Sequence, residues 1–269
     1  MPAAELNRLR AQINSLVQRF EDPVDLRNGL RDLLELYGNR AYRAGQAVQT
    51  QSILPTYRIT PLVMRQLEME LSKTCQEQPA AALNAVEAIW KDAYLEPRML
   101  ACTLLGSIPA SHAEAVSQKL RQWAKPEENS RMLDALFELG TVMLRREEPH
   151  RVLALVEEWI GSHRADRQAL GLRALTPLVR DPAFENLPPV FRLLSPLVQH
   201  VQQPLQTDLQ IVLESLAKRA STETAYFLRQ TLSMSSGPGT ARLIRRCLPA
   251  FEPEEQRSLR VALQSANPP

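Results

Sequence analysis

The sequence predicts an all-α protein built from stacked helical hairpins, and three observations support this fold class. A Trp near the end of one amphipathic segment is followed eight positions later by an Arg that opens the next segment, at Trp90 and Arg98 and again at Trp159 and Arg167. Apolar patterns of helical period recur about every 35 residues, the length of two helices and two short loops. The chain has 9 glycines and 5% aromatic residues, a composition that favours helix over sheet. Because one hairpin cannot bury its own apolar side, several must stack.

The first helices are predicted by apolar residues at helical spacing, at about 3–20 and 23–37. A polar stretch, 46–52, follows them. Thr60 is then expected to cap a helix that begins at Pro61, because a hydroxyl residue before a proline is typical of a helix start.

After residue 79 the pattern becomes periodic. We expect the first helices of successive hairpins near 79–92, 112–124, 149–161, 187–202 and 222–233. The second helices are expected near 97–107, 127–146, 164–179, 205–219 and 239–250. A last helix at 253–265 would cover the end of the stack.

Composition leaves the class of partner open. The formal charge is +2, from 32 Lys and Arg against 30 Asp and Glu, which neither requires nor excludes a polyanion. The three cysteines, Cys75, Cys102 and Cys247, are far apart and odd in number, which favours reduced thiols. No apolar run reaches the length of about 20 residues that a membrane span needs. We therefore expect a cytoplasmic protein that does not enter membranes, and no metal or cofactor site.

Basic residues recur on the predicted second helices. In a curved stack one helix of each pair lines the concave side, so these residues could form a cationic groove for phosphates. The alternative is an ordinary solvated surface, since Arg is a good helix former. The candidate DNA-binding residues are Arg98, Arg131, Arg167, Arg242, Arg245 and Arg246.

Three segments resemble successive landmarks of the AlkD-type alkylpurine DNA glycosylases. They are Tyr57-Arg-Ile-Thr-Pro-Leu-Val-Met-Arg65, then Trp90 with Glu96-Pro-Arg98, then Trp159-Ile with Arg167-Gln-Ala-Leu. The resemblance implies HEAT-like repeats in a solenoid whose basic concave side holds duplex DNA by its backbone. On this basis we expect a single α-solenoid domain over 1–269, with N-terminal helices in 1–75, HEAT-like repeats in 79–250 and a capping helix in 253–265.

The catalytic residues of that family are mostly missing from the matching positions. Its aspartate aligns with Met132, and its two tryptophans align with Glu128 and Ile211. Its arginine is retained as Arg167. Met cannot stabilise an oxocarbenium-like sugar, and Ile offers no π face to a cationic base. The nearest acid, Asp134, lies about 200° further round the helix.

The sequence thus leads to one main hypothesis with two alternatives, and names no catalytic residue. We expect a sequence-independent DNA-binding protein, related to alkylation repair, that lacks glycosylase activity. The first alternative is a HEAT-type scaffold that binds an acidic protein or peptide. The second is an active alkylpurine glycosylase with a shifted site, in which Asp134 or Glu128 reaches the groove.

Overall fold

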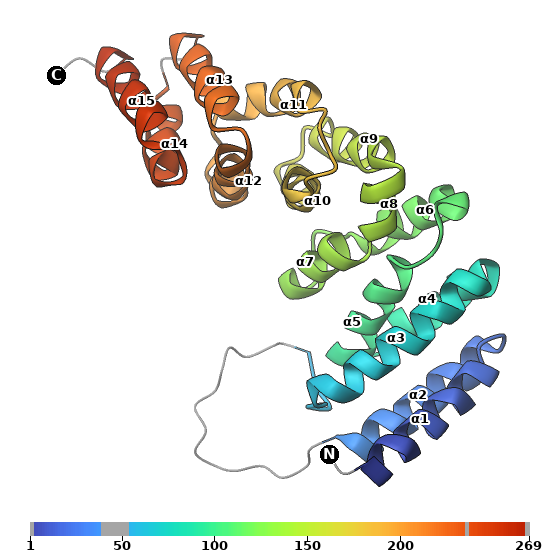
Figure 1. Ribbon diagram of the computed structural model, residues 1–269. Coiled ribbons are helices and arrows are strands. Elements are labelled where there is room, and N and C mark those ends of the chain that lie inside the picture. The colour runs from blue at the N-terminus through green and yellow to red at the C-terminus, as the bar shows by residue number, and fades with distance from the viewer. Residues whose placement is uncertain (1–2, 39–53, 235–236, 267–269) are drawn as a thin grey trace. The chain divides into compact units, whose positions relative to one another are not determined.

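The computed structural model describes residues 3–38, 54–234 and 237–266 (Figure 1). Of these residues 80% are helical and none lies in a strand, which confirms the all-α prediction. The polar stretch 46–52 lies outside the described residues. Contacts within the chain cluster into two compact units, Met1–Glu148 and Pro149–Pro269. That the whole chain forms a single domain stays a prediction.

In the first unit the helices pack in two rows. One row consists of α1 (Ala3–Gln18), α3 (Pro61–Glu77), α5 (Leu95–Leu105) and α7 (Ser130–Leu139). The other contains α2 (Pro23–Tyr37) and α4 (Pro79–Trp90), and α6 (Ala113–Trp123) joins it through side-chain contacts with α4. A short helix, α8 (Val142–Glu147), ends the unit.

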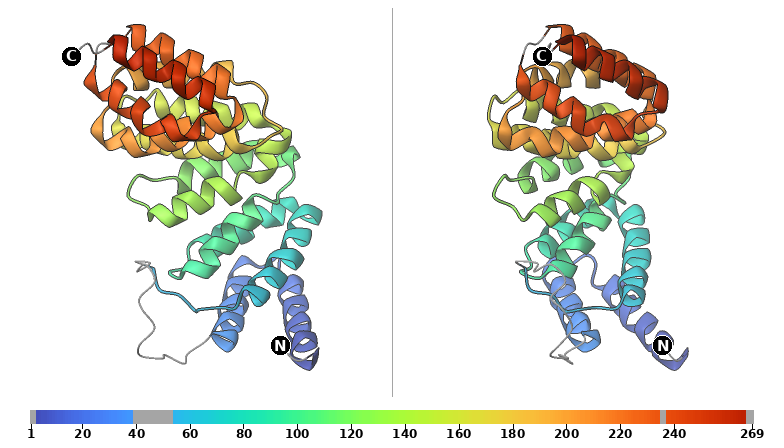
Figure 2. Two further views of the ribbon diagram at one scale, coloured as in Figure 1. Left: turned by 60° about the vertical axis from the view of Figure 1, so that its left-hand side comes forward. Right: turned by 90° about the vertical axis from the view of Figure 1, so that its left-hand side faces the viewer.

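The second unit repeats this arrangement (Figures 1 and 2). The second-helix layer consists of α10 (Ala165–Arg180), α12 (Gln206–Arg219) and α14 (Pro238–Cys247), which pack on one another in that order. The first-helix layer consists of α9 (Pro149–Ile160), α11 (Pro188–Gln199), α13 (Ser221–Met234) and α15 (Pro253–Ala266). Leu, Val and Ala side chains fill the space between the two layers.

The two tryptophans of the repeated signature are both buried, as core packing requires. Trp90 is 9% exposed and Trp159 is 3% exposed. The three cysteines are also buried, and burial raises the pKa of each thiol to about 12. These thiols are therefore neutral packing groups at physiological pH.

Two details of the sequence prediction were wrong. The helix expected over 127–146 is broken, because Gly140 and Thr141 separate α7 from α8. Thr60 does precede the first residue of α3, but its side chain makes no capping hydrogen bond.

The side chain of Arg145, on α8, stabilises the break between α7 and α8 through hydrogen bonds. Its Nη1 donates to the carbonyl oxygens of Phe137 and Glu138, each at 2.9 Å, and to the hydroxyl of Thr141. Carbonyls at the end of a helix have no partner within that helix, so a guanidinium that folds back supplies the missing donors.

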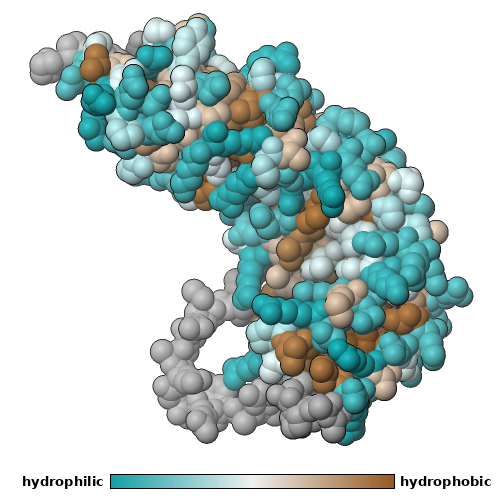
Figure 3. Space-filling view, in the orientation of Figure 1, coloured by the Kyte–Doolittle hydropathy of each residue, from teal (hydrophilic) through white to brown (hydrophobic). Residues whose placement is uncertain are grey.

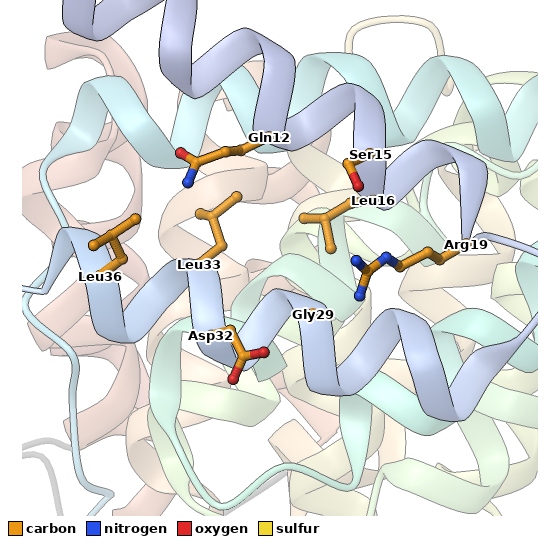
Figure 4. A pocket seen from close by; sticks show the side chains of 8 residues that line it. All are labelled: Gln12, Ser15, Leu16, Arg19, Gly29, Asp32, Leu33 and Leu36. Carbon is orange, nitrogen blue, oxygen red and sulfur yellow. The ribbon is translucent and has the colours of Figure 1, made fainter.

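A shallow depression lies between α1 and α2 (Figure 4). Its floor is formed where Gly29 faces Leu16, and a Cβ on Gly29 would lie 2.9 Å from the Cδ2 of Leu16. The rim carries Arg19 and Asp32. The missing side chain at Gly29 thus allows the close approach of the two helices.

Candidate nucleic-acid interface

The positions that the resemblance assigns to catalysis lie in different environments in the structure. Met132 on α7 is fully buried and belongs to the core. Ile211 on α12 is 38% exposed. Asp134 is exposed on α7, and Glu128 precedes that helix in an internal ion pair. A thioether in the core cannot take the place of a carboxylate that must face a sugar.

Arg98, a candidate DNA contact, is held by internal partners. Its Nη2 lies 2.5 Å from Oε2 of Glu128, and its guanidinium carbon stands 4.1 Å from the ring centre of Trp90. Only 9% of the residue is exposed. Because the guanidinium is already paired and stacked, Arg98 does not present a charge to solvent as Arg131 does.

The contacts of Trp90 extend this cluster to α6. Its ring stacks on that of Trp123, with the ring centres 4.5 Å apart and an angle of 4° between the ring planes. The Nε1 of Trp123 donates to Glu87, and both Lys91 and Lys119 pair with the same carboxylate. Burial would raise the pKa of Glu87, but these hydrogen bonds outweigh it and hold the pKa below the ordinary value. The cluster ties α4, α5 and α6 together.

Glu128 also organises the start of α7. Its Oε1 accepts a hydrogen bond from the backbone nitrogen of Asn129, whose side chain in turn accepts from the backbone nitrogen of Arg131. Asn129 is therefore the N-cap of α7. The Arg131 side chain is exposed and makes no ion pair with the described residues.

The other four candidates all lie on the second-helix layer of the second unit. Arg167 is in the first turn of α10, and Arg242, Arg245 and Arg246 are on α14. All four are exposed, and none pairs through its side chain with a described residue. Figure 3 shows a largely hydrophilic surface over this part of the chain.

Charge is unevenly divided between the two layers of the second unit. The second-helix layer has eight basic residues against three acidic ones, Asp166, Asp208 and Glu214. The first-helix layer has five basic and five acidic residues. The eight basic residues are Arg167, Arg173, Arg180, Lys218, Arg219, Arg242, Arg245 and Arg246.

The three carboxylates of the second-helix layer already have partners. Asp166 pairs with Arg164 at 2.5 Å, and this contact lowers the pKa of Asp166. Asp208 pairs with Arg173 at 3.4 Å, and Glu214 accepts a hydrogen bond from Gln210 at 2.7 Å. Of the three, Asp208 forms an ion pair with a basic residue of the layer, Asp166 pairs with Arg164 just before α10, and Glu214 keeps its charge because Gln210 is neutral.

The basic excess does not continue on the matching helices of the first unit. Helices α5 and α7 carry two basic residues, Arg98 and Arg131, against three acidic ones, Glu96, Asp134 and Glu138. The six candidates of the sequence analysis thus divide into four exposed residues on a basic layer, one exposed residue in a mixed environment and one internal residue.

Sequence reasoning left two exposed basic residues out of the candidate set. Lys218 and Arg180 lie in the last turns of α12 and α10 and are exposed. Their position at the C-terminal ends of neighbouring second helices is the signal that would have identified them. Arg219, beside Lys218, is an internal residue that binds backbone carbonyls at the end of α10.

Two other kinds of site were searched for across residues 3–38, 54–234 and 237–266. No group of three or more His, Cys, Asp or Glu side chains within them could hold a metal ion. No helix in these ranges is both long and apolar enough to cross a membrane.

Comparison with known families identifies the class of this protein. Residues 30–246 match the sequence model of a family described as DNA alkylation repair enzyme. The match covers most of the chain, from within α2 to the last turn of α14, and the chain therefore belongs to this family. No curated protein and no solved structure matches the chain.

Proposed function

We propose that this protein binds duplex DNA by its phosphate backbone, without sequence preference, through the second-helix layer of the second unit. The observation that carries the proposal is the ratio of eight basic to three acidic residues on that layer, against five and five on the layer behind it. Membership of a DNA alkylation repair family supports DNA as the polyanion. Arg167, Arg242, Arg245 and Arg246 are the proposed contacts on this layer, and Arg131 is proposed as a separate phosphate contact on the first unit.

A salt titration of duplex binding tests this proposal. Each neutralised phosphate releases condensed counterion, so four or more contacts should give a log–log slope of affinity against salt of about −3 to −4 or steeper. Arg245→Gln and Arg246→Gln should each reduce the slope by about one. Arg192→Gln is the matched control, because Arg192 is an exposed arginine on the first-helix layer.

Failure of the unaltered protein to bind would contradict the proposal. Dissociation constants weaker than about 100 μM at low salt fall below ordinary non-specific binding. That result would favour the alternative of a scaffold for an acidic protein or peptide.

We further propose that the protein does not excise alkylated bases. Burial of Met132 and the internal pairing of Glu128 support this, since neither side chain can stabilise positive charge on a sugar. A duplex with a single N-methylated purine should release no base above the spontaneous background. Excision that is lost in Asp134→Asn would instead support an active enzyme with a shifted site.

A further inference from the structure

Four of the six exposed basic residues of the second-helix layer lie at one end of its helices. Arg180, Lys218 and the pair Arg245 and Arg246 all lie in the last turns of α10, α12 and α14. The first turn of α10 carries Asp166 beside Arg167, and the first turn of α12 carries Asp208 and no basic residue. The layer therefore has a basic edge, which we define as Arg180, Lys218, Arg245 and Arg246.

Contacts between the helices bring these last turns together. The Nε of Arg180 donates to the hydroxyl of Ser215 at 3.2 Å, one turn before Lys218. Helix α14 packs on α12, and the pKa of Cys247, which directly follows Arg246, is raised by burial and also by the nearby charge of Glu214, next to Ser215. The three helices thus run in the same direction, and the members of the basic edge follow one another across the layer.

Helix capping does not account for this edge. A basic residue in a last turn offsets the partial negative charge of a helix end, which amounts to about half a charge. At α10 this task falls to Arg219, which donates to the carbonyl oxygens of Val179 at 2.6 Å and Asp181 at 2.7 Å, and also to that of Phe184. Arg180 and Lys218 are additional to that cap, and α14 ends with two full charges.

We propose that the basic edge is a track for the phosphates of one DNA strand, which runs across the ends of α10, α12 and α14. This inference rests on the proposed function and specifies where on the layer the backbone lies. Packed helices are about 8–10 Å apart. Phosphates of one strand rise about 3.4 Å each along the duplex axis and also wind round it, so that successive phosphates are about 7 Å apart. Neighbouring helices would therefore meet phosphates one or two positions apart.

One carboxylate lies beside this track. Glu214 is half-buried on α12, close to the end of α14, and its partner is the neutral side chain of Gln210. A phosphate on the track would be repelled by this charge. Removal of the Glu214 charge should consequently strengthen the binding of duplex DNA. If the basic edge served only to stabilise the fold, this substitution would not strengthen binding.

The test compares variants of the full-length protein on one mixed-sequence duplex, with anisotropy measured over a range of salt concentrations. Lys218→Gln and Arg180→Gln should each lower the salt slope by about one, as one lost phosphate contact requires. Arg192→Gln removes the same charge from the first-helix layer and should leave the slope unchanged. Glu214→Gln should tighten binding about threefold or more at low salt.

Methylphosphonate substitution, which removes the charge of a single phosphate, locates the track on the DNA. Neutral linkages placed singly along one strand should weaken binding at positions one or two apart within a short stretch of that strand. An unchanged slope in both Lys218→Gln and Arg180→Gln, or unchanged affinity in Glu214→Gln, would overturn the track while duplex binding itself stands. Absence of duplex binding by the unaltered protein would overturn both the track and the proposed function.

Discussion

At the scale of single residues, the pair of Arg98 and Glu128 is the most informative contact of the first unit. An arginine and a glutamate that are 30 positions apart meet at 2.5 Å, and the arginine also stacks on Trp90. The resemblance described above aligns Glu128 with a tryptophan of the glycosylases. In this chain that position supports the fold instead, because it anchors Arg98 and the start of α7 together.

We predict that loss of either partner destabilises the protein. The side chains of Arg98 and Glu128 are 11% and 18% exposed, so Arg98→Met or Glu128→Gln would leave a mostly buried charge without its partner, at a cost of about 3 kcal/mol. Urea denaturation measures this change. Arg131→Met, at an exposed position nearby, should change stability by less than about 0.5 kcal/mol.

The double variant distinguishes a specific pair from two independent effects. If Arg98 and Glu128 act together, the double variant should lose clearly less than the sum of the two single variants. Additive losses would show that the ion pair is not what stabilises this region.

At the scale of elements, two arginines act as caps at helix ends. Arg145 folds back over the last carbonyls of α7, and Arg219 binds carbonyls at the end of α10. Arg145 is followed by the exposed Arg146, and Arg219 is preceded by the exposed Lys218. Adjacent basic residues of the same helix thus have different roles, one internal and one facing solvent.

We predict that Arg145 and Arg146 differ sharply in their effect on stability. Arg145→Met removes the donors for the carbonyls of Phe137 and Glu138, which should cost about 1–3 kcal/mol. Arg146→Met should be close to neutral, because the residue is exposed and has no partner among the described residues. Thermal unfolding followed by circular dichroism compares the two. Similar melting temperatures for both variants would argue against the cap.

At the scale of the whole molecule, contacts divide the chain into two units, while the sequence predicts a single domain. The three tryptophans are placed so that they can report on each unit, with Trp90 and Trp123 in the first and Trp159 in the second. In a repeat array, stability is the sum of local terms and terms between neighbouring repeats. If the terms between neighbouring repeats are strong, both units should unfold together.

We predict that the two units unfold in one transition, as a single domain requires. Trp159→Phe leaves fluorescence that reports on the first unit, and Trp90→Phe with Trp123→Phe leaves a reporter in the second. Within each variant, urea curves from fluorescence and from circular dichroism at 222 nm should coincide. A fluorescence midpoint that departs from the circular dichroism midpoint of the same variant would show that its unit unfolds separately.

The sequence by itself determined the helical class, the position of nearly all helices and the family. Apolar residues at helical spacing and prolines at helix starts are local signals, because they depend only on residues that are close together in the sequence. From the sequence we also predict that Met132, Glu128 and Ile211 stand at the catalytic positions of the family that the chain resembles.

Only the tertiary structure decided which arginines are internal and which face solvent. Arg98, Arg145 and Arg219 look like Arg131, Arg146 and Lys218 in the sequence, yet the first three are bound to a carboxylate or to carbonyls. The carboxylate of Glu128 reaches Arg98 across 30 positions, and the carbonyl of Val179 reaches Arg219 across 40. A basic side chain on a helix binds whichever acceptor packing brings close, and for Arg98 and Arg219 that acceptor comes from another hairpin, so sequence spacing alone could not identify it.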